Sequence, residues 1–326
     1  MANTRRTFLQ SAALAAGLSG AASSAQSRAA GLGPGQLPGQ PPSQDAGPLK
    51  SASEMQVPKV KFGNVEISRL VLGCNPFYGY AHFNKILGGL MSEWYTQDRV
   101  CGVLHQCNRF GINAYNCVTM GRSLQDLEHF QAEGGKMHLI VQGSPGSDPA
   151  AIVKAFKPLA LYHVGDTVDR AFQTGNLDDI KEWSKKARDT GVMVGVGTHK
   201  PEVIATIEEE GWDVDFYAGC VYNRTRTPDE LRKLLGGELP MPRGEVFLED
   251  DPPRMYKVIR QTKKPCFAFK ILAAGRIERP EALDLALRTA FGSIKPTDCI
   301  FVGMFPKFQD EVRANVESTV RILTKS

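Results

Sequence analysis

The chain has 326 residues, a formal net charge of +4 and seven cysteines. Its basic residues form no continuous stripe, so the sequence gives no support for nucleic-acid binding. About 270 residues follow position 56, which is enough for one large hydrophobic core.

The first 25 residues are typical of an export signal. Arg5 and Arg6 precede a short alanine-rich stretch, and small residues offer a cleavage site after Ala25. This segment resembles a twin-arginine signal, so we expect a periplasmic or secreted protein that meets the twin-arginine export machinery. The apolar stretch is too short for a stable membrane anchor. Residues 26–56, rich in Gly, Pro and Ser, predict an unstructured linker.

From residue 57 to 326, short apolar runs alternate with amphipathic segments. Segment 176–191 has acidic residues early, basic residues late and Gly191 at its end, as a capped helix does. Eight strand–helix units predict a single-domain α/β fold, a (β/α)₈ TIM barrel; a doubly wound open sheet is the alternative. The predicted strands are 69–75, 112–118, 137–143, 159–165, 192–199, 214–223, 265–275 and 299–304.

Polar side chains stand at the ends of these predicted strands, where barrels build their ligand sites. Among them, His163 ends the run "LALYHVG" and is expected to face the barrel mouth. Two long loops, 75–97 and 224–253, are expected to cover that mouth. Their aromatic rings suit stacking on a sugar-like substrate, with plain packing onto the barrel as the alternative. The residues expected to contact a small-molecule substrate are Asn75, Tyr80, His82, Gln142, Asp166 and Asn223.

Taken in order, these segments resemble the aldo-keto reductase family across residues 58–322. "VEISRLVLGCNPF" is similar to the family's opening strand, "LALYHVGD" to the strand that ends in its catalytic histidine, and "FVGMFPKFQDEVRANV" to its last strand and phosphate-binding helix. The resemblance implies an oxidoreductase that uses NADP on a small carbonyl or hydroxyl compound, with His163 orienting the oxygen. It places Phe269, Thr198, Tyr217, Gly303 and Lys307 at cofactor-binding positions.

The catalytic residues of that family are only partly kept. Asn116 stands at its aspartate position and Gln142 at its lysine position, and a neutral amide supplies no charge to lower the pKa of a phenol. A tyrosine from elsewhere, such as Tyr222, Tyr80 or Tyr217, would replace the missing acid. Together with His163, the predicted catalytic residues are Lys270, Asn116 and Tyr222.

Two other functions stay open. His163 and His199 end neighbouring predicted strands and, with His82 or Asp166, would hold a divalent metal ion for a lyase, isomerase or hydrolase. Lys270 would then act as a base or as a clamp on an enediolate. Alternatively, the barrel binds a ligand without catalysis. Most cysteines lie inside apolar runs, so we expect buried thiols.

Overall fold

The computed structural model describes residues 51–324, except 144–145, 238–241 and 243. The predicted export signal and most of the predicted linker therefore lie outside the described residues. The last part of that linker is structured, which corrects its expected boundary. A 3₁₀ turn, η1 (Ala52–Glu54), leads into Met55, whose side chain is only 3% exposed.

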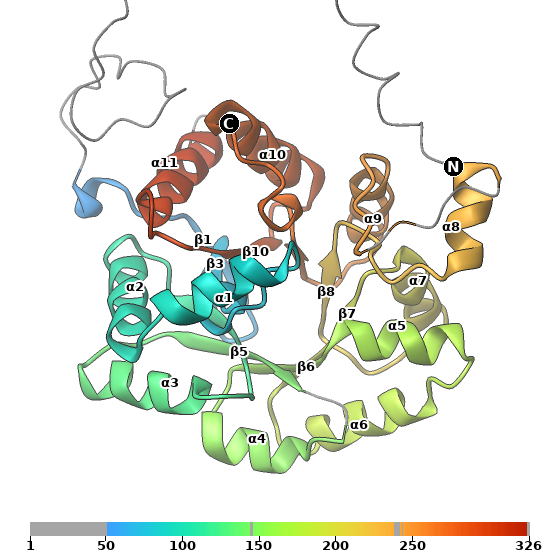
Figure 1. Ribbon diagram of the computed structural model, residues 1–326. Coiled ribbons are helices and arrows are strands. Elements are labelled where there is room, and N and C mark those ends of the chain that lie inside the picture. The colour runs from blue at the N-terminus through green and yellow to red at the C-terminus, as the bar shows by residue number, and fades with distance from the viewer. Residues whose placement is uncertain (1–50, 144–145, 238–241, 243, 325–326) are drawn as a thin grey trace, which may run out of the picture. The chain divides into compact units, whose positions relative to one another are not determined.

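Within the described residues, eight parallel strands close into a barrel in the order β10-β3-β4-β5-β6-β7-β8-β9 (Figure 1). The barrel excludes the open sheet because β10 pairs with both β3 and β9. Each strand falls inside one of the eight predicted runs, which confirms them. The strands are β3 (Leu70–Gly73), β4 (Ala114–Val118), β5 (His138–Gly143), β6 (Ala160–His163), β7 (Met193–Thr198), β8 (Phe216–Cys220), β9 (Cys266–Phe269) and β10 (Cys299–Gly303).

Helices surround the strands as an outer layer (Figure 1). They start at ordinary capping signals; the Asp148 carboxylate, for example, accepts hydrogen bonds from the first free N–H groups of α4. None of the described helices is long and apolar enough to cross a membrane. The layer contains α2 (Gln97–Arg109), α3 (Ser123–Ala132), α4 (Pro149–Phe156), α5 (Gly165–Gln173), α6 (Asp178–Arg188), α7 (Pro201–Glu209), α9 (Asp251–Gln261), α10 (Pro280–Ser293) and α11 (Glu311–Thr324).

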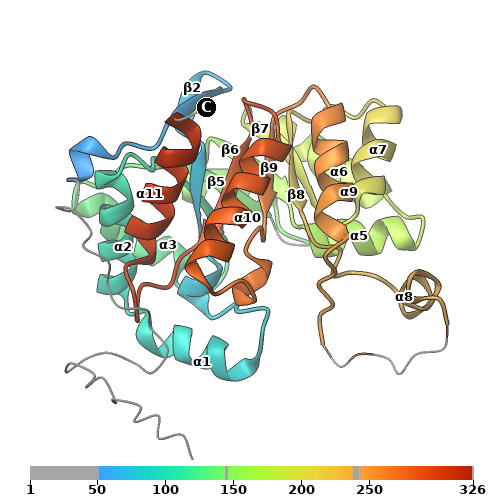
Figure 2. The ribbon, with the colours of Figure 1, turned by 90° about the horizontal axis from the view of Figure 1, so that it is seen from above.

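An antiparallel hairpin, β1 (Lys59–Phe62) and β2 (Val65–Ser68), precedes the barrel and was not predicted. Its Phe62 ring packs edge-on against Phe216 and Phe267 in the barrel interior, at centroid distances of 5.3 and 5.1 Å. Figure 2 shows the hairpin at the end of the barrel opposite to α1 (Lys85–Trp94). The hairpin therefore closes the amino-terminal end and leaves the carboxyl-terminal mouth for ligands.

The two predicted long loops contain short helices: η2 (Asn75–Tyr78) and α1 in the first, and α8 (Pro228–Leu235) in the second. In the first loop, Trp94 and Tyr95 pack edge-on against each other and also contact Phe305. Plain packing is thus the role of these two rings. Tyr80 differs because it is 40% exposed. All seven cysteines are buried free thiols, which confirms that expectation.

Candidate active site

A cavity of about 500 Å³ lies at the carboxyl-terminal mouth of the barrel. Its wall combines strand ends with both long loops, so it lies where barrels place their chemistry. Its size and its mixture of aromatic and polar groups suit a small metabolite. The predicted residues that line it are Asn75, Tyr80, His82, Asn116, Gln142, Asp166, His199, Phe269, Lys270 and Gly303.

Lys270 lines this cavity together with Arg224. It follows β9 directly, and its Nζ lies 5.2 Å from the centroid of the Phe269 ring. Burial lowers the pKa of Lys270, and the Arg224 charge lowers it further against an opposing effect of Cys220. Among the described residues it forms no ion pair with a carboxylate, although Arg224 nearby forms two. Its backbone is left-handed (φ 59°), a conformation that costs a non-glycine residue energy.

The His199 ring is fixed by two neighbours. Its Nδ1 lies 2.7 Å from the buried Asp169 carboxylate, and Arg224 Nε donates to its Nε2 at 3.1 Å. Because an arginine N–H can only donate, Nε2 is the acceptor and the Nδ1 proton is donated to Asp169. Burial lowers the pKa of His199 and outweighs the effect of Asp169. His199 is therefore a neutral, oriented imidazole.

Arg224 joins the second loop to the rest of the mouth. Its guanidinium donates to Glu245 Oε1 at 2.7 Å and also pairs with Asp166. Glu245 in turn lies 2.9 Å from His82 Nδ1. Burial alone would raise the pKa of Glu245, but the His82 hydrogen bond and the Arg224 charge lower it to about 2. Glu245 therefore stays ionised and holds both loops together.

A neutral network crosses the cavity floor. Asn116 Nδ2 donates to the Tyr162 hydroxyl at 2.9 Å, and Gln142 Nε2 donates to Asn116 Oδ1 at 3.1 Å. Since the Tyr162 oxygen accepts, its own proton is free to point toward a ligand. Burial raises the pKa of Tyr162 well above its usual range, so the phenol is protonated. The floor thus offers a neutral hydrogen-bond donor.

Glu311, the first residue of α11, lines the same cavity. Its Oε2 accepts a hydrogen bond from the Phe305 N–H at 2.6 Å. Burial raises the pKa of Glu311 to about 7, although the Phe305 N–H acts in the other direction. A carboxyl group with a pKa near neutrality is suited to give and take a proton.

The expectation that His163 faces the mouth is wrong. Neighbouring residues of a strand point to opposite faces, and Tyr162 takes the inner face. His163 therefore points outward, where its ring packs edge-on against Trp183 at 4.9 Å. It cannot join His199 and His82 around one metal ion. The His199 nitrogens are also already bonded to Asp169 and Arg224.

Other predicted residues also lie outside the cavity. The Tyr217 hydroxyl lies on the helix side, 2.6 Å from Glu208, and the Tyr222 ring packs on Phe247 at 5.1 Å. Neither tyrosine reaches the cavity as the missing acid. Six site residues predicted from the sequence do not line the cavity: His163, Thr198, Tyr217, Tyr222, Asn223 and Lys307.

Sequence reasoning missed several groups of this site. Tyr162 comes one residue before His163. Because neighbouring side chains of a strand point to opposite faces, only one of the two can face the barrel interior, and knowing which face comes first would have identified Tyr162. Glu311 is the first residue of α11 and was not predicted as a site residue. Asp169 and Glu245 carry no sequence signal, because only the fold brings them to His199 and His82.

The molecule is a (β/α)₈ barrel with a polar cavity at its carboxyl-terminal mouth. No family model and no curated protein matches the chain, so membership of the aldo-keto reductase family stays a prediction. Among solved structures, a truncated 3-deoxy-D-arabino-heptulosonate 7-phosphate synthase from Thermotoga maritima is similar (13% identity, 83% of this chain, 92% of that chain, TM-score 0.48). A mandelate oxidase with 3,3-difluoro-2-hydroxy-3-phenylpropionic acid is also similar (12% identity, 85% of this chain, 79% of that chain, TM-score 0.48). The fold rests on this chain's own strand order, and these similarities say nothing about its chemistry.

Proposed function

We propose that this protein is a barrel enzyme that acts on a small carbonyl or hydroxyl compound, with the Lys270 amine as the reacting group. The observation that carries the proposal is a lysine in the cavity with a lowered pKa and no carboxylate ion pair among the described residues. Burial and a neighbouring cation are the two conditions that turn a lysine into a nucleophile.

The proposed chemistry combines Lys270 with two other groups of the cavity wall, Tyr162 and Glu311. The free amine adds to a substrate carbonyl, and loss of water gives an imine that draws electrons from the adjacent C–H or C–C bond. Tyr162 donates a hydrogen bond to the carbonyl oxygen, which leaves as water. Glu311, with its pKa near 7, takes the proton released from carbon and returns it later. The resulting activity is that of a lyase or an isomerase.

Borohydride trapping tests this proposal. The protein is incubated with a panel of small aldehydes, ketones and sugars and then reduced, and peptide mass spectrometry locates the adduct. We expect one adduct, on Lys270, and at least a tenfold lower yield in Lys270→Met. Lys307→Met, at an exposed lysine, is the matched control and should trap as the parent does. Equal trapping by Lys270→Met and the parent would overturn the proposal.

A second candidate is a dinucleotide-dependent reductase, favoured by the Tyr162 hydroxyl that Asn116 holds. In this alternative Tyr162 supplies the proton that the lost family tyrosine would have given. Phe269 and Gly303 remain in the cavity wall as contacts for NADP, and the Tyr80 ring offers a stacking face for a sugar-like substrate. Native mass spectrometry separates the candidates: bound dinucleotide without borohydride adducts supports the reductase.

A further inference from the structure

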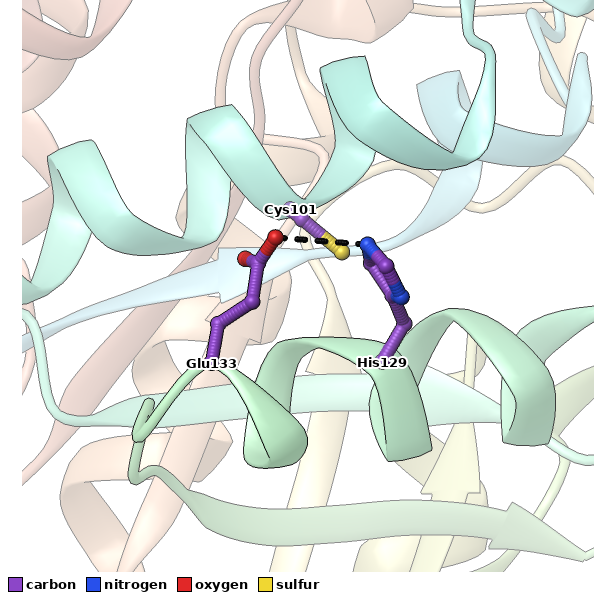
Figure 3. A group of neighbouring side chains, drawn as sticks. All are labelled: Cys101, His129 and Glu133. Atoms are coloured by element: carbon purple, nitrogen blue, oxygen red, sulfur yellow. Dashed lines mark ion pairs between the residues drawn. The ribbon is translucent and has the colours of Figure 1, made fainter.

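Cys101, His129 and Glu133 form a cluster outside the barrel, between the neighbouring helices α2 and α3 (Figure 3). The Cys101 thiol points from α2 toward α3, and the other two side chains approach it from α3 and its C-cap. One ligand atom from each residue lies within 4.8 Å of the other two. The cluster shares no residue with the cavity wall.

A fourth donor stands beside these three. His105 lies one helical turn after Cys101 on α2, and its Nε2 is 2.7 Å from Glu133 Oε2. The other oxygen of Glu133 lies 3.2 Å from His129 Nε2. Each helix thus offers a pair of donors four residues apart, the spacing that places two side chains on one helix face.

We propose that Cys101, His105, His129 and Glu133 bind one divalent transition-metal ion of the zinc type, which joins α2 to α3. Thiolate, imidazole and carboxylate are the ligands that zinc takes in proteins, at about 2.0–2.3 Å. Ligands of a tetrahedral ion at these lengths stand roughly 3.4 Å apart. The ligand atoms of Cys101, His129 and Glu133, which lie within 4.8 Å of one another, need to approach by up to about 1.4 Å to reach this spacing. His105 is outside that group, so it has to move further toward Cys101 and His129.

Partial exposure leaves room for that movement. The side chains of His129 and Glu133 are 40% and 42% exposed, so their rotamers can adjust from the solvent side. The His105 side chain is 32% exposed, and its ring has to move across the Phe130 ring, against which it packs at a centroid distance of 4.8 Å. Cys101 is fixed because its sulfur is buried, 3.5 Å from the Asp126 carbonyl oxygen. On metal binding the Cys101 thiol loses its proton to solvent, and the thiolate and carboxylate together neutralise the two charges of the ion. Four protein ligands make the site structural rather than catalytic.

Cobalt(II) is the probe, because a cobalt–thiolate bond gives a charge-transfer absorption that nitrogen and oxygen ligands do not give. The full purified chain, first treated with a chelator, is titrated with Co²⁺ and then with Zn²⁺. We expect one ion per chain by native mass spectrometry, a thiolate band with cobalt, its loss when zinc displaces cobalt, and a higher Tm with zinc.

Variants locate the site. Cys101→Ser should abolish the thiolate band. His129→Gln should weaken cobalt binding at least 10–100-fold, because losing even a residue that only hydrogen-bonds to a metal ligand typically costs that much affinity. The matched controls, Cys107→Ser on the same helix and His138→Gln on β5, should bind as the parent does. His129→Gln replaces a partly exposed side chain, so it tests the proposal even if Cys101→Ser fails to fold. A parent chain without a thiolate band, or a Cys101→Ser chain with the parent's band, would overturn the proposal.

Discussion

Asp169 is the buried carboxylate on which the hydrogen bonds below the mouth converge. It accepts from the His199 ring at 2.7 Å, from the His199 N–H and from the hydroxyls of Thr198 and Thr225. All these partners are donors, so the site requires an acceptor with two oxygens. An asparagine of the same shape would present an NH₂ group to one of them.

We therefore expect Asp169→Asn to lower the free energy of unfolding by about 3 kcal/mol, since it leaves buried donors without an acceptor. Urea unfolding measures the change. Asp179→Asn, at an exposed position of α6, is the control and should stay within about 0.5 kcal/mol of the parent. Equal stability of the two variants would show that the Asp169 bonds contribute little.

Glu311 gives stability a pH dependence whose sign follows from its raised pKa. A carboxyl group whose folded pKa (about 7) exceeds its ordinary value (4.5) contributes its full stability below pH 4.5 and loses it as the pH rises through 7. Glu311→Gln removes this loss while keeping an acceptor for the Phe305 N–H. We expect the variant to be roughly 1–3 kcal/mol more stable than the parent at pH 8, with little difference at pH 4.5.

Urea unfolding at the two pH values measures this effect. A constant difference between Glu311→Gln and the parent at both values would contradict the assignment of the pH dependence to this carboxyl group. An effect confined to the higher pH would confirm it.

Residue identity at a strand end was predictable, but residue direction was not. The sequence marked His163 correctly as the end of β6, and the parity of that strand decided that Tyr162, and not His163, faces the cavity. Parity depends on where the barrel interior begins along each strand, which a short, continuously apolar run does not reveal. Lys270 and His199 were found because they follow their strands, where the chain turns into the mouth.

At the scale of elements, the contact between β5 and α6 depends on a glycine. A Cβ added at Gly143 would stand 2.2 Å from Cζ2 of Trp183, closer than any real contact. The ring is rigid and also packs on His163, so it cannot move away freely. The Trp183 ring of α6 can lie against β5 here only because residue 143 has no side chain.

We expect Gly143→Ala to destabilise the protein by roughly 1–3 kcal/mol, as overpacking does. Gly102→Ala is the matched control, because nothing lies within 4 Å of an added Cβ in the middle of α2. That change should stabilise the protein by about 0.5–1 kcal/mol, since alanine is the better helix former. Thermal unfolding of both variants measures the difference, and a stabilised Gly143→Ala would refute the packing argument.

The order of elements followed from the sequence because each buried strand is a short apolar run between amphipathic helices. The β1–β2 hairpin escaped prediction for a related reason. Its strands, "KVKF" and "VEIS", alternate with charged residues and contribute few apolar side chains. Their role appears only once Phe62 meets Phe216 and Phe267, which are distant in sequence.

At the scale of the whole molecule, all seven thiols are buried and free. We expect a thiol reagent such as Ellman's to label native protein slowly and to label seven thiols in denaturant, because burial keeps the thiol both protonated and inaccessible. A reducing agent should leave the Tm unchanged. Rapid labelling of several thiols in native buffer, or a Tm lowered by reduction, would contradict this arrangement.

The left-handed backbone at Lys270 has a consequence for anyone who selects this protein for heat resistance. Glycine adopts this conformation without the penalty of about 1 kcal/mol or more that a side chain carries. A screen that selects for thermal stability alone would therefore select Lys270→Gly, and the selected variants would lack the amine of the cavity. Robustness and reactivity compete at this one residue, so a useful screen has to select for both.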